Sequence, residues 1–397
     1  MIVAKKVLKQ MEETGWIRRM FEEGIVMKKT YGDDNVYDFS LGNPDIEPPE
    51  TLRQALIDAL QHPVPGMHRY MPNNGYEEVR ENVASYLREI HKVNFSTKHV
   101  YMSAGSAGGL NILLKSMLSK GDEVIVPTPY FMEFKYYIES HGGVIKLVDT
   151  QDDFQLDINK IEEAITKKTK IILLNSPNNP TGTVYSEETL RELASLLYKE
   201  RKAGRKICIV SDDAYKKLVY GDVPLPNIFQ IYDLVIAVTS HSKDLAIPGE
   251  RIGYIAISPS IEEADSLISA LMFSSRALGF VNAPALFQRI IGNFQNNSVN
   301  IDAYREKRDV MYNTLMDAGF ECVKPTGAFY LFPKSPIPDE LQFVRILQNE
   351  ERILVVPGRG FGKEGYFRIA YCVPMKKIVG AVEGFKRIGR KYYTRGQ

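Results

Sequence analysis

The stretch KIILLNSPNNPTG, residues 170–182, is a short apolar run that stops at a cluster of asparagine, proline and glycine. A run of this length bounded by turn residues is typical of a buried β-strand. Similar runs recur along the middle of the chain, namely VYMS (100–103), EVIVP (123–127), VIKLV (144–148), KICIVSD (206–212), LVIAVTS (234–240) and IGYIAIS (252–258). Stretches of helical length separate most of them. We therefore expect an α/β fold with a mostly parallel, seven-stranded sheet and helices on both faces.

The connection between the last two runs is short. Residues 241–251 contain Pro248 and Gly249 and leave little room for a helical crossover. Parallel neighbours need such a crossover, whereas antiparallel neighbours do not. One strand at this point is therefore expected to run antiparallel.

The chain length of 397 residues exceeds the usual size of a single domain. Residues 46–284 contain the strand rhythm and are predicted to form a large domain. Residues 1–45 and 285–397 lie outside it and combine helical spacing, as in DAYREKRDVMYNTLMDAG (302–319), with the strand-like runs GAFYLF (327–332) and YFRIAYC (366–372). We expect both chain ends to build a smaller α/β domain.

Composition excludes several classes of protein. The chain has 50 Lys and Arg against 49 Asp and Glu, a net charge of +1, and so lacks the excess of positive charge that is typical of nucleic-acid-binding proteins. The three cysteines are far apart and fit neither a disulfide framework nor a paired-cysteine metal site. No apolar run has the length of a membrane helix, and the first residues lack a signal core. We expect a cytoplasmic protein without a membrane span or metal, whose partners are small molecules.

Open parallel sheets bind ligands beyond the carboxyl ends of their strands. The loop SAGSAGGLN, residues 103–111, follows one strand and opens a helix, so its bare amides could bind an anion, or it could be only a tight turn. Asp212 ends another strand, where a buried acid needs a cation, although a helix N-cap is an equal alternative. Alone, Lys243 would be assigned to the solvated surface.

One glycine pattern is misleading. Residues 360–365 match the GxGxxG spacing of dinucleotide-binding loops. That motif requires a helix to open on its third glycine, and here the strand-like YFRIAYC follows instead. Nucleotide binding is not expected at this point.

Taken together, GSAG, PYF, NNPTG, SDDAY, SHSK, ERIG and FRIAY occur in the order found in the class I and II aminotransferases. These are pyridoxal-phosphate-dependent enzymes of fold type I, and the resemblance covers nearly the whole chain. It implies an aminotransferase that moves the amino group of an α-amino acid to a 2-oxo acid, 2-oxoglutarate being the expected acceptor. A lyase on the same scaffold is the alternative, because a fold does not fix a reaction. A regulator that binds the cofactor without catalysis is a third reading, which the lack of a basic stripe disfavours.

The resemblance also implies roles for individual residues. Lys243 matches the lysine that holds pyridoxal 5'-phosphate as a Schiff base, Asp212 the partner of the ring nitrogen, and Tyr215 a ligand of the phenolic oxygen. The remaining matches are Asn179 at the same oxygen, Phe131 on the ring face, Ser106, Ala107, Ser240 and Arg251 at the phosphate, and Gly42 and Arg368 at the substrate, Arg368 binding its α-carboxylate. Tyr70 matches a tyrosine that reaches the neighbouring subunit's phosphate, which implies a homodimer with shared sites and an inactive monomer.

Departures from the family pattern leave the donor open between aspartate and a broad range. Ala107 stands where one aspartate-using branch has a lysine for the distal carboxylate. Arg276 lies near the position of an arginine with that purpose in another branch, although a surface role is the simpler reading. Glu250 precedes Arg251 and is expected only to orient its guanidinium.

Overall fold

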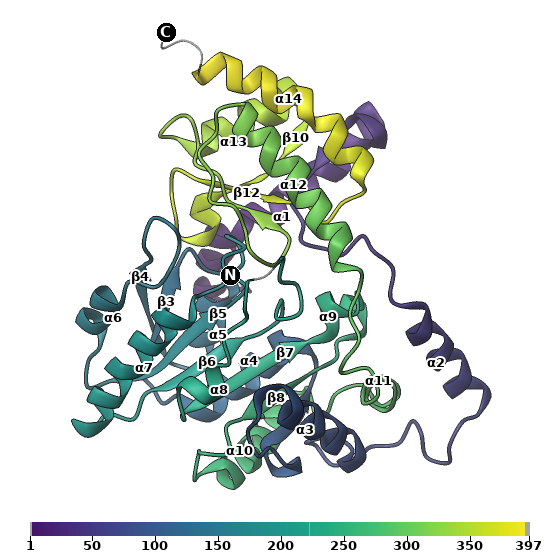
Figure 1. The fold of residues 1–397 in the computed structure, drawn as a ribbon, viewed down its shortest axis with the longest axis vertical. Helices are drawn as coiled ribbons and strands as arrows, with labels where there is room; N and C mark the ends of the chain where they lie inside the picture. The colour runs from purple at the N-terminus through teal and green to yellow at the C-terminus, as the bar shows by residue number, and fades with distance from the viewer. Residues whose placement is uncertain (1, 222, 394–397) are drawn as a thin grey trace.

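The computed structural model describes residues 2–221 and 223–393 (Figure 1). Each of the seven apolar runs forms a strand of one sheet, in the order β2-β8-β7-β6-β5-β3-β4. The strands are β2 (Val100–Ser103), β3 (Glu123–Thr128), β4 (Val144–Asp149), β5 (Thr169–Asn175), β6 (Cys208–Asp212), β7 (Val235–Ser240) and β8 (Gly253–Ile257). β8 runs antiparallel to β2 and β7, and the other pairs are parallel. The predicted sheet and its antiparallel strand are confirmed.

Helices lie on both faces of this sheet (Figure 1). They follow the strands because the intervening segments space apolar residues at helical intervals. In chain order they are α1 (Lys5–Tyr31), α2 (Glu50–Gln61), α3 (Glu77–His91), α4 (Gly105–Met117), α5 (Glu133–Ser140), α6 (Ile158–Ala164), α7 (Glu187–Lys202), α8 (Ile228–Ile231), α9 (His241–Asp244), α10 (Ala264–Ala277), α11 (Ala285–Ile291), α12 (Ile301–Asp317), α13 (Glu340–Glu351) and α14 (Met375–Tyr393). α4 packs on β7 and β8, and α6 packs on β4 and α7.

The chain builds two main apolar cores. One lies within residues 52–291 and joins the large sheet to its helices. The other combines Met20 and Phe39 with residues from 215–220 and 299–388. Around it lie α12, α13 and α14, together with the short strands β1 (Tyr37–Asp38), β9 (Tyr330–Leu331), β10 (Ile353–Leu354), β11 (Val356–Pro357) and β12 (Phe367–Ala370) (Figure 1). The exact domain limits near residues 46 and 284 stay a prediction.

The glycine-rich segment at residues 360–365 precedes a strand, as the sequence indicated. Gly358–Phe361 forms a 3-10 turn, and β12 follows with no helix between them. The segment therefore lacks the helix N-terminus on which a pyrophosphate would rest.

The single helical turn α9 follows β7 and depends on its surroundings for its position. A helix of one turn leaves most of its main-chain groups without internal partners. The Ser240 hydroxyl caps it by accepting from the Ser242 N–H at 3.1 Å. At its two ends the His241 N–H donates to the Ile252 carbonyl at 3.0 Å, and the Asp244 carbonyl accepts from the Val299 N–H at 2.7 Å. These bonds tie α9 to both cores.

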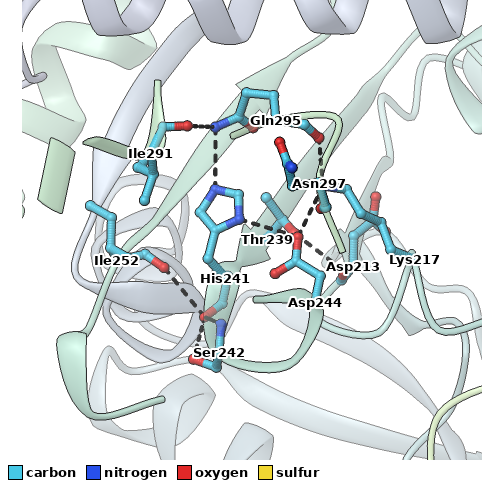
Figure 2. A network of polar contacts seen from close by, with 11 residues as sticks. Asp213, Lys217, Thr239, His241, Ser242, Asp244, Ile252, Ile291, Gln295 and Asn297 are labelled. Carbon is cyan, nitrogen blue, oxygen red and sulfur yellow. Dashed lines mark hydrogen bonds and ion pairs between the residues drawn. The ribbon is translucent and has the colours of Figure 1, made fainter. Parts of the chain in front are cut away.

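Side chains reinforce the same attachment (Figure 2). The Lys217 ammonium lies 3.1 Å from Asp244 Oδ2 and donates to the carbonyls of Gln295 at 2.5 Å and Asn297 at 3.0 Å. His241 Nδ1 lies 3.2 Å from the same Asp244 oxygen. Asp244 is buried, and the charges of His241 and Lys217 hold its pKa below the ordinary value even though burial alone would raise it. Lys217 therefore links α9 to the segment that leads into α12.

We expect Lys217→Met to lower the free energy of unfolding by about 2–4 kcal/mol, because it leaves the buried Asp244 carboxylate without its lysine partner. The measurement is denaturant unfolding of the purified protein. Lys199→Met is the matched control, since Lys199 pairs with Glu162 on the exposed surface and should cost at most about 1 kcal/mol. Equal losses in the two variants would contradict the role given to Lys217, and Lys217→Met/Asp244→Asn should recover part of the loss.

Candidate active site

A cavity of about 330 Å³ opens beyond the carboxyl ends of the parallel strands. Its wall contains every site residue predicted from the sequence except Tyr70 and the weaker candidate Arg276. The described lining residues are Leu41, Gly42, Ser106, Ala107, Phe131, Glu133, Tyr137, Asn175, Asn179, Asp212, Ala214, Tyr215, Ser240, Ser242, Lys243, Pro248, Arg251, Tyr330 and Arg368. Segments far apart in the chain thus meet where an open α/β sheet is expected to bind its ligand.

Lys243 on α9 is half-buried, and its amine lies in the cavity wall. Its Nζ donates to the Gly42 carbonyl at 2.7 Å and lies 5.4 Å from the centre of the Phe329 ring. Burial lowers the pKa of Lys243 to about 8, and the charges of Arg368 and Arg251 act in the same direction. An amine with this pKa is partly neutral near neutral pH, which makes it a usable nucleophile and proton carrier.

Asp212 lies at the end of β6, between β5 and β7. Its Oδ1 accepts a hydrogen bond from the Ala214 N–H at 3.3 Å, and within the described chain it forms no ion pair. Burial, followed by the charge of Asp213, raises the pKa of Asp212 to about 7. The residues after it form a turn and no helix, so the N-cap alternative is wrong. A buried carboxylate is costly unless a cation pairs with it, and Asp212 has no such partner among the described residues.

One end of the cavity is suited to an anion. Arg251 faces the start of α4, and a side chain at Gly105 would come within 2.8 Å of the Arg251 guanidinium. Gly105 also has a φ of +70°, which a side chain would disfavour. The hydroxyls of Ser240 and Ser242 lie 2.5 Å apart beside it. A guanidinium, hydroxyls and the free N–H groups of a helix N-terminus form a typical phosphate site.

Arg251 is not oriented by Glu250. Its Nη1 donates to the Pro248 carbonyl at 2.8 Å, and within the described chain no ion pair joins it to Glu250, which is exposed. The expected orienting role of Glu250 is therefore wrong. The reason is the left-handed conformation of Arg251, with φ of +51°, in which its side chain bonds back to the preceding turn.

Arg368 on β12 lies at the other end of the cavity. It is 2% exposed, so the alternative of a surface ion pair is wrong. Nη1 donates to Asn179 Oδ1 at 3.0 Å and Nη2 to the Ser40 carbonyl at 2.6 Å, while Nε is buried without a partner in the described chain. The guanidinium lies over the ring of Tyr330 at 4.7 Å. A fixed guanidinium with a free N–H is ready to bind a carboxylate.

The turn after β5 and the strand β9 bring further polar groups to this end. The NNPTG turn positions Asn179, whose N–H donates to Asn175 Oδ1 at 2.7 Å. The hydroxyls of Tyr215 and Tyr330 lie 2.7 Å apart, and burial raises the pKa of both phenols. A side chain at Gly42 would meet the Tyr330 hydroxyl at 2.0 Å, so only glycine fits there.

Several lining residues were missed in the sequence. Asn175 ends β5 as Asp212 ends β6, so the strand-end signal could have found it. Glu133 and Tyr137 on α5 had no such signal, because they follow β3 by several residues. Tyr330 comes from β9 at the far end of the chain, and its place depends on how the two cores pack.

Two predicted residues do not line the cavity of this chain. Tyr70 is 89% exposed, and Arg276 is exposed in the last turn of α10. Among the described residues there is no cluster of His, Cys, Asp and Glu that could hold a metal ion. Nor is any described helix long and apolar enough to cross a membrane.

Known proteins share this architecture. The model of the family "Aminotransferase class I and II" matches residues 34–385. A probable aspartate aminotransferase of Methanocaldococcus jannaschii is 33% identical, over 88% of this chain and 92% of its own. The aspartate aminotransferase of Bacillus subtilis is 30% identical, over 92% and 93%.

Solved structures agree. The crystal structure of an amino transferase from Eubacterium rectale has a TM-score of 0.95 and 36% identity, over 99% of this chain and 100% of its own. The aspartate aminotransferase of Thermotoga maritima has a TM-score of 0.86 and 26% identity, over 97% and 99%. Because the family model and these relatives span most of its length, this chain belongs to the class I and II aminotransferases, with the fold of the type I enzymes.

Proposed function

We propose that this aminotransferase uses pyridoxal 5'-phosphate, bound through Lys243, to move the amino group of an α-amino acid to 2-oxoglutarate. The proposal is carried by one observation: three complementary groups meet in one cavity. They are the Lys243 amine, whose pKa is lowered, the buried Asp212 carboxylate, which has no cation among the described residues, and the anion site formed by Arg251 and the start of α4. Each matches one functional group of the cofactor, namely its aldehyde, its ring nitrogen and its phosphate.

The residues fit this cofactor in charge and in shape. Asp212 would hold the protonated ring nitrogen, which relieves the cost of its own burial. Arg251, Ser240, Ser106 and the main-chain N–H of Ala107 would hold the phosphate. Phe131 would cover the ring face, and Asn179 and Tyr215 would bind its phenolic oxygen. The bound cofactor supplies an electron sink for the substrate Cα.

Lys243 would act twice in the reaction. Its neutral amine would first hold the cofactor. Once the substrate amine takes that place, the freed lysine would take the proton from the donor Cα, and in the second half of the cycle it would give a proton to the Cα of the new amino acid. Arg368 would bind the α-carboxylate, with the Gly42 main chain close to the substrate. By holding the α-carboxylate, Arg368 would place the substrate Cα, and not the distal part of the substrate side chain, beside Lys243.

The proposed donor range is broad and includes aspartate. The naming of several relatives as aspartate aminotransferases supports a dicarboxylic substrate. Arg368 would recognise the α-carboxylate that all amino acids share, which supports a wide range of donors.

We further propose a cytoplasmic homodimer with shared sites. Tyr70 projects from the surface, where it would reach the phosphate of a second copy. Large apolar side chains are also exposed in this chain, among them Leu41, Val64, Phe273 and Phe280. Where such side chains lie together on the surface, they are typical of a protein interface.

The rate at which the cofactor-free protein captures pyridoxal 5'-phosphate should rise about tenfold per pH unit and level off above about pH 8, because only the neutral Lys243 amine reacts. Lys243→Ala should lose turnover by at least about a hundredfold. Stopped-flow absorbance and a donor assay measure both. Lys206→Ala, an exposed lysine paired with Glu263, is the control and should behave as wild type. A capture profile that still rises at pH 10, or an active Lys243→Ala variant, would refute the assignment.

Asp212→Asn should stabilise the cofactor-free protein at pH 8 while weakening cofactor binding. Burial raises the pKa of Asp212 from 3.8 to about 7, so its folded form prefers the proton. Wild-type stability should therefore fall between about pH 4 and pH 7, by up to about 4 kcal/mol. Asp212→Asn has no carboxyl group to titrate at this position, so its stability should not show this fall.

The measurement is the thermal stability of the wild type and of Asp212→Asn across this pH range, with and without cofactor. Asp152→Asn, at an exposed carboxylate, controls for the change in net charge. If Asp212→Asn destabilised the cofactor-free protein at pH 8, or left cofactor affinity unchanged, the role of Asp212 would be wrong.

A further inference from the structure

Glu133 is a carboxyl group in the cavity wall that none of the roles above uses. It begins α5 and lines the cavity together with Arg368 and Tyr330. Its Oε2 is shielded from solvent and has no hydrogen-bond partner in the part of the chain that the structure describes. A buried acceptor left unpaired is destabilising, so a ligand that reached this carboxyl group and donated a hydrogen bond to it would relieve that cost.

The charges around Glu133 place it at the substrate end. Arg368 is the cation that acts on it, and the charge of Glu133 in turn acts on the phenols of Tyr330 and Tyr137. No ion pair joins Glu133 to Arg368 within the described residues, because the two terminal nitrogens of Arg368 donate to Asn179 and Ser40. A substrate held on Arg368 would therefore have Glu133 among its neighbours.

We propose that Glu133 is a specificity-determining residue, whose carboxylate accepts a hydrogen bond from the substrate side chain and so favours donors that end in an amide over their acidic isosteres. The inference rests on the proposed aminotransferase function, and within the broad donor range proposed there it ranks amides above the corresponding acids without excluding the acids. An amide N–H donates to a carboxylate, whereas a second carboxylate in the same place repels it.

The rest of the cavity wall supports this choice. The position that would carry a lysine for a distal carboxylate is Ala107, and Arg276 is exposed outside the cavity. The described cations of the wall are Lys243, Arg251 and Arg368, and each already has a proposed partner. A side-chain carboxylate would thus meet Glu133 with no cation of its own.

The acceptor 2-oxoglutarate also ends in a carboxylate, and Glu133 can meet it in its protonated form, which donates. Burial raises the pKa of Glu133, against smaller opposite contributions from its own main-chain N–H and from Arg368. The titratable and charged groups around it in the cavity are Tyr137 on α5, Arg368 on β12, Tyr330 on β9, Asp212 on β6, Lys243 on α9, Tyr215 and Arg251. Since the acid form is lost as pH rises, binding of 2-oxoglutarate should weaken with pH while binding of an amide strengthens.

The test compares glutamine with glutamate, which differ only in the amide. In single-turnover half-reactions of the loaded enzyme at about pH 8, wild type should react at least about tenfold faster with glutamine, a difference of about 1.4 kcal/mol. Glu133→Gln, which is neutral, should bring the two rates within about threefold, mainly by improving glutamate. Calorimetric titration with 2-methylglutamine and 2-methylglutamate, which lack the Cα hydrogen and cannot be transaminated, should show the same ratios in Kd.

Two controls separate specificity from folding. Glu188→Gln, on the exposed face of α7, removes the same charge and should leave the ratio unchanged. Glu133→Ala should also abolish the preference, with weaker binding of both amino acids. The KM for 2-oxoglutarate should rise with pH in wild type and stay flat in Glu133→Gln.

The inference is overturned if wild type prefers glutamate, or if Glu133→Gln keeps the wild-type ratio. It is equally overturned if aromatic amino acids react and neither member of the pair does, although the enzyme would then still be an aminotransferase. Only a loaded protein that reacts with no amino acid of any class would remove the proposed function itself.

Discussion

The Asp212 carboxylate, buried at the end of β6 without a cation, is the constraint on which the rest of the cavity depends. A charge in this position is stable only when an opposite charge arrives. The same wall holds Lys243, Arg251 and Arg368, and no ion pair joins any of them to Asp212 in the described chain. The protein thus keeps its cations for groups on a ligand, which in our account are an aldehyde, a phosphate and a carboxylate. Keeping Asp212 apart from these cations lowers the stability of the cofactor-free protein. It also leaves each charged group available to bind a group on the ligand.

The large sheet could be predicted because its signals are local. Short apolar runs ended by turn residues predicted each strand, and the brief Pro-Gly link predicted the antiparallel one. Asp212 could be singled out because it ends β6, whereas most of the other lining residues, Asn179 and Lys243 among them, were named by their resemblance to the family motifs. Their roles came from resemblance, because no spacing rule distinguishes a cofactor lysine from a surface lysine.

The parts that could not be predicted depend on contacts between distant segments. Tyr330 reaches the cavity only because β9 packs beside β12, and Glu133 joins the cavity wall from the first turn of α5. The wrong expectation for Glu250 has a similar origin. Its neighbour Arg251 takes a left-handed conformation, which turns the guanidinium toward Pro248 and away from the adjacent acid. Sequence adjacency alone does not give side-chain direction.

The position and the reactivity of the Lys243 amine both depend on α9. Lys217 and Asp244 tie this turn to the segment before α12 (Figure 2), and the turn holds the Lys243 amine beside Gly42 and in the field of Arg368. The cofactor and the substrate would then meet at one amine. The most direct test is to treat the loaded protein with borohydride, which fixes the cofactor to its lysine, and to map the labelled peptide by mass spectrometry. We predict a single label on Lys243; a label on any other lysine, or none, would contradict the central claim.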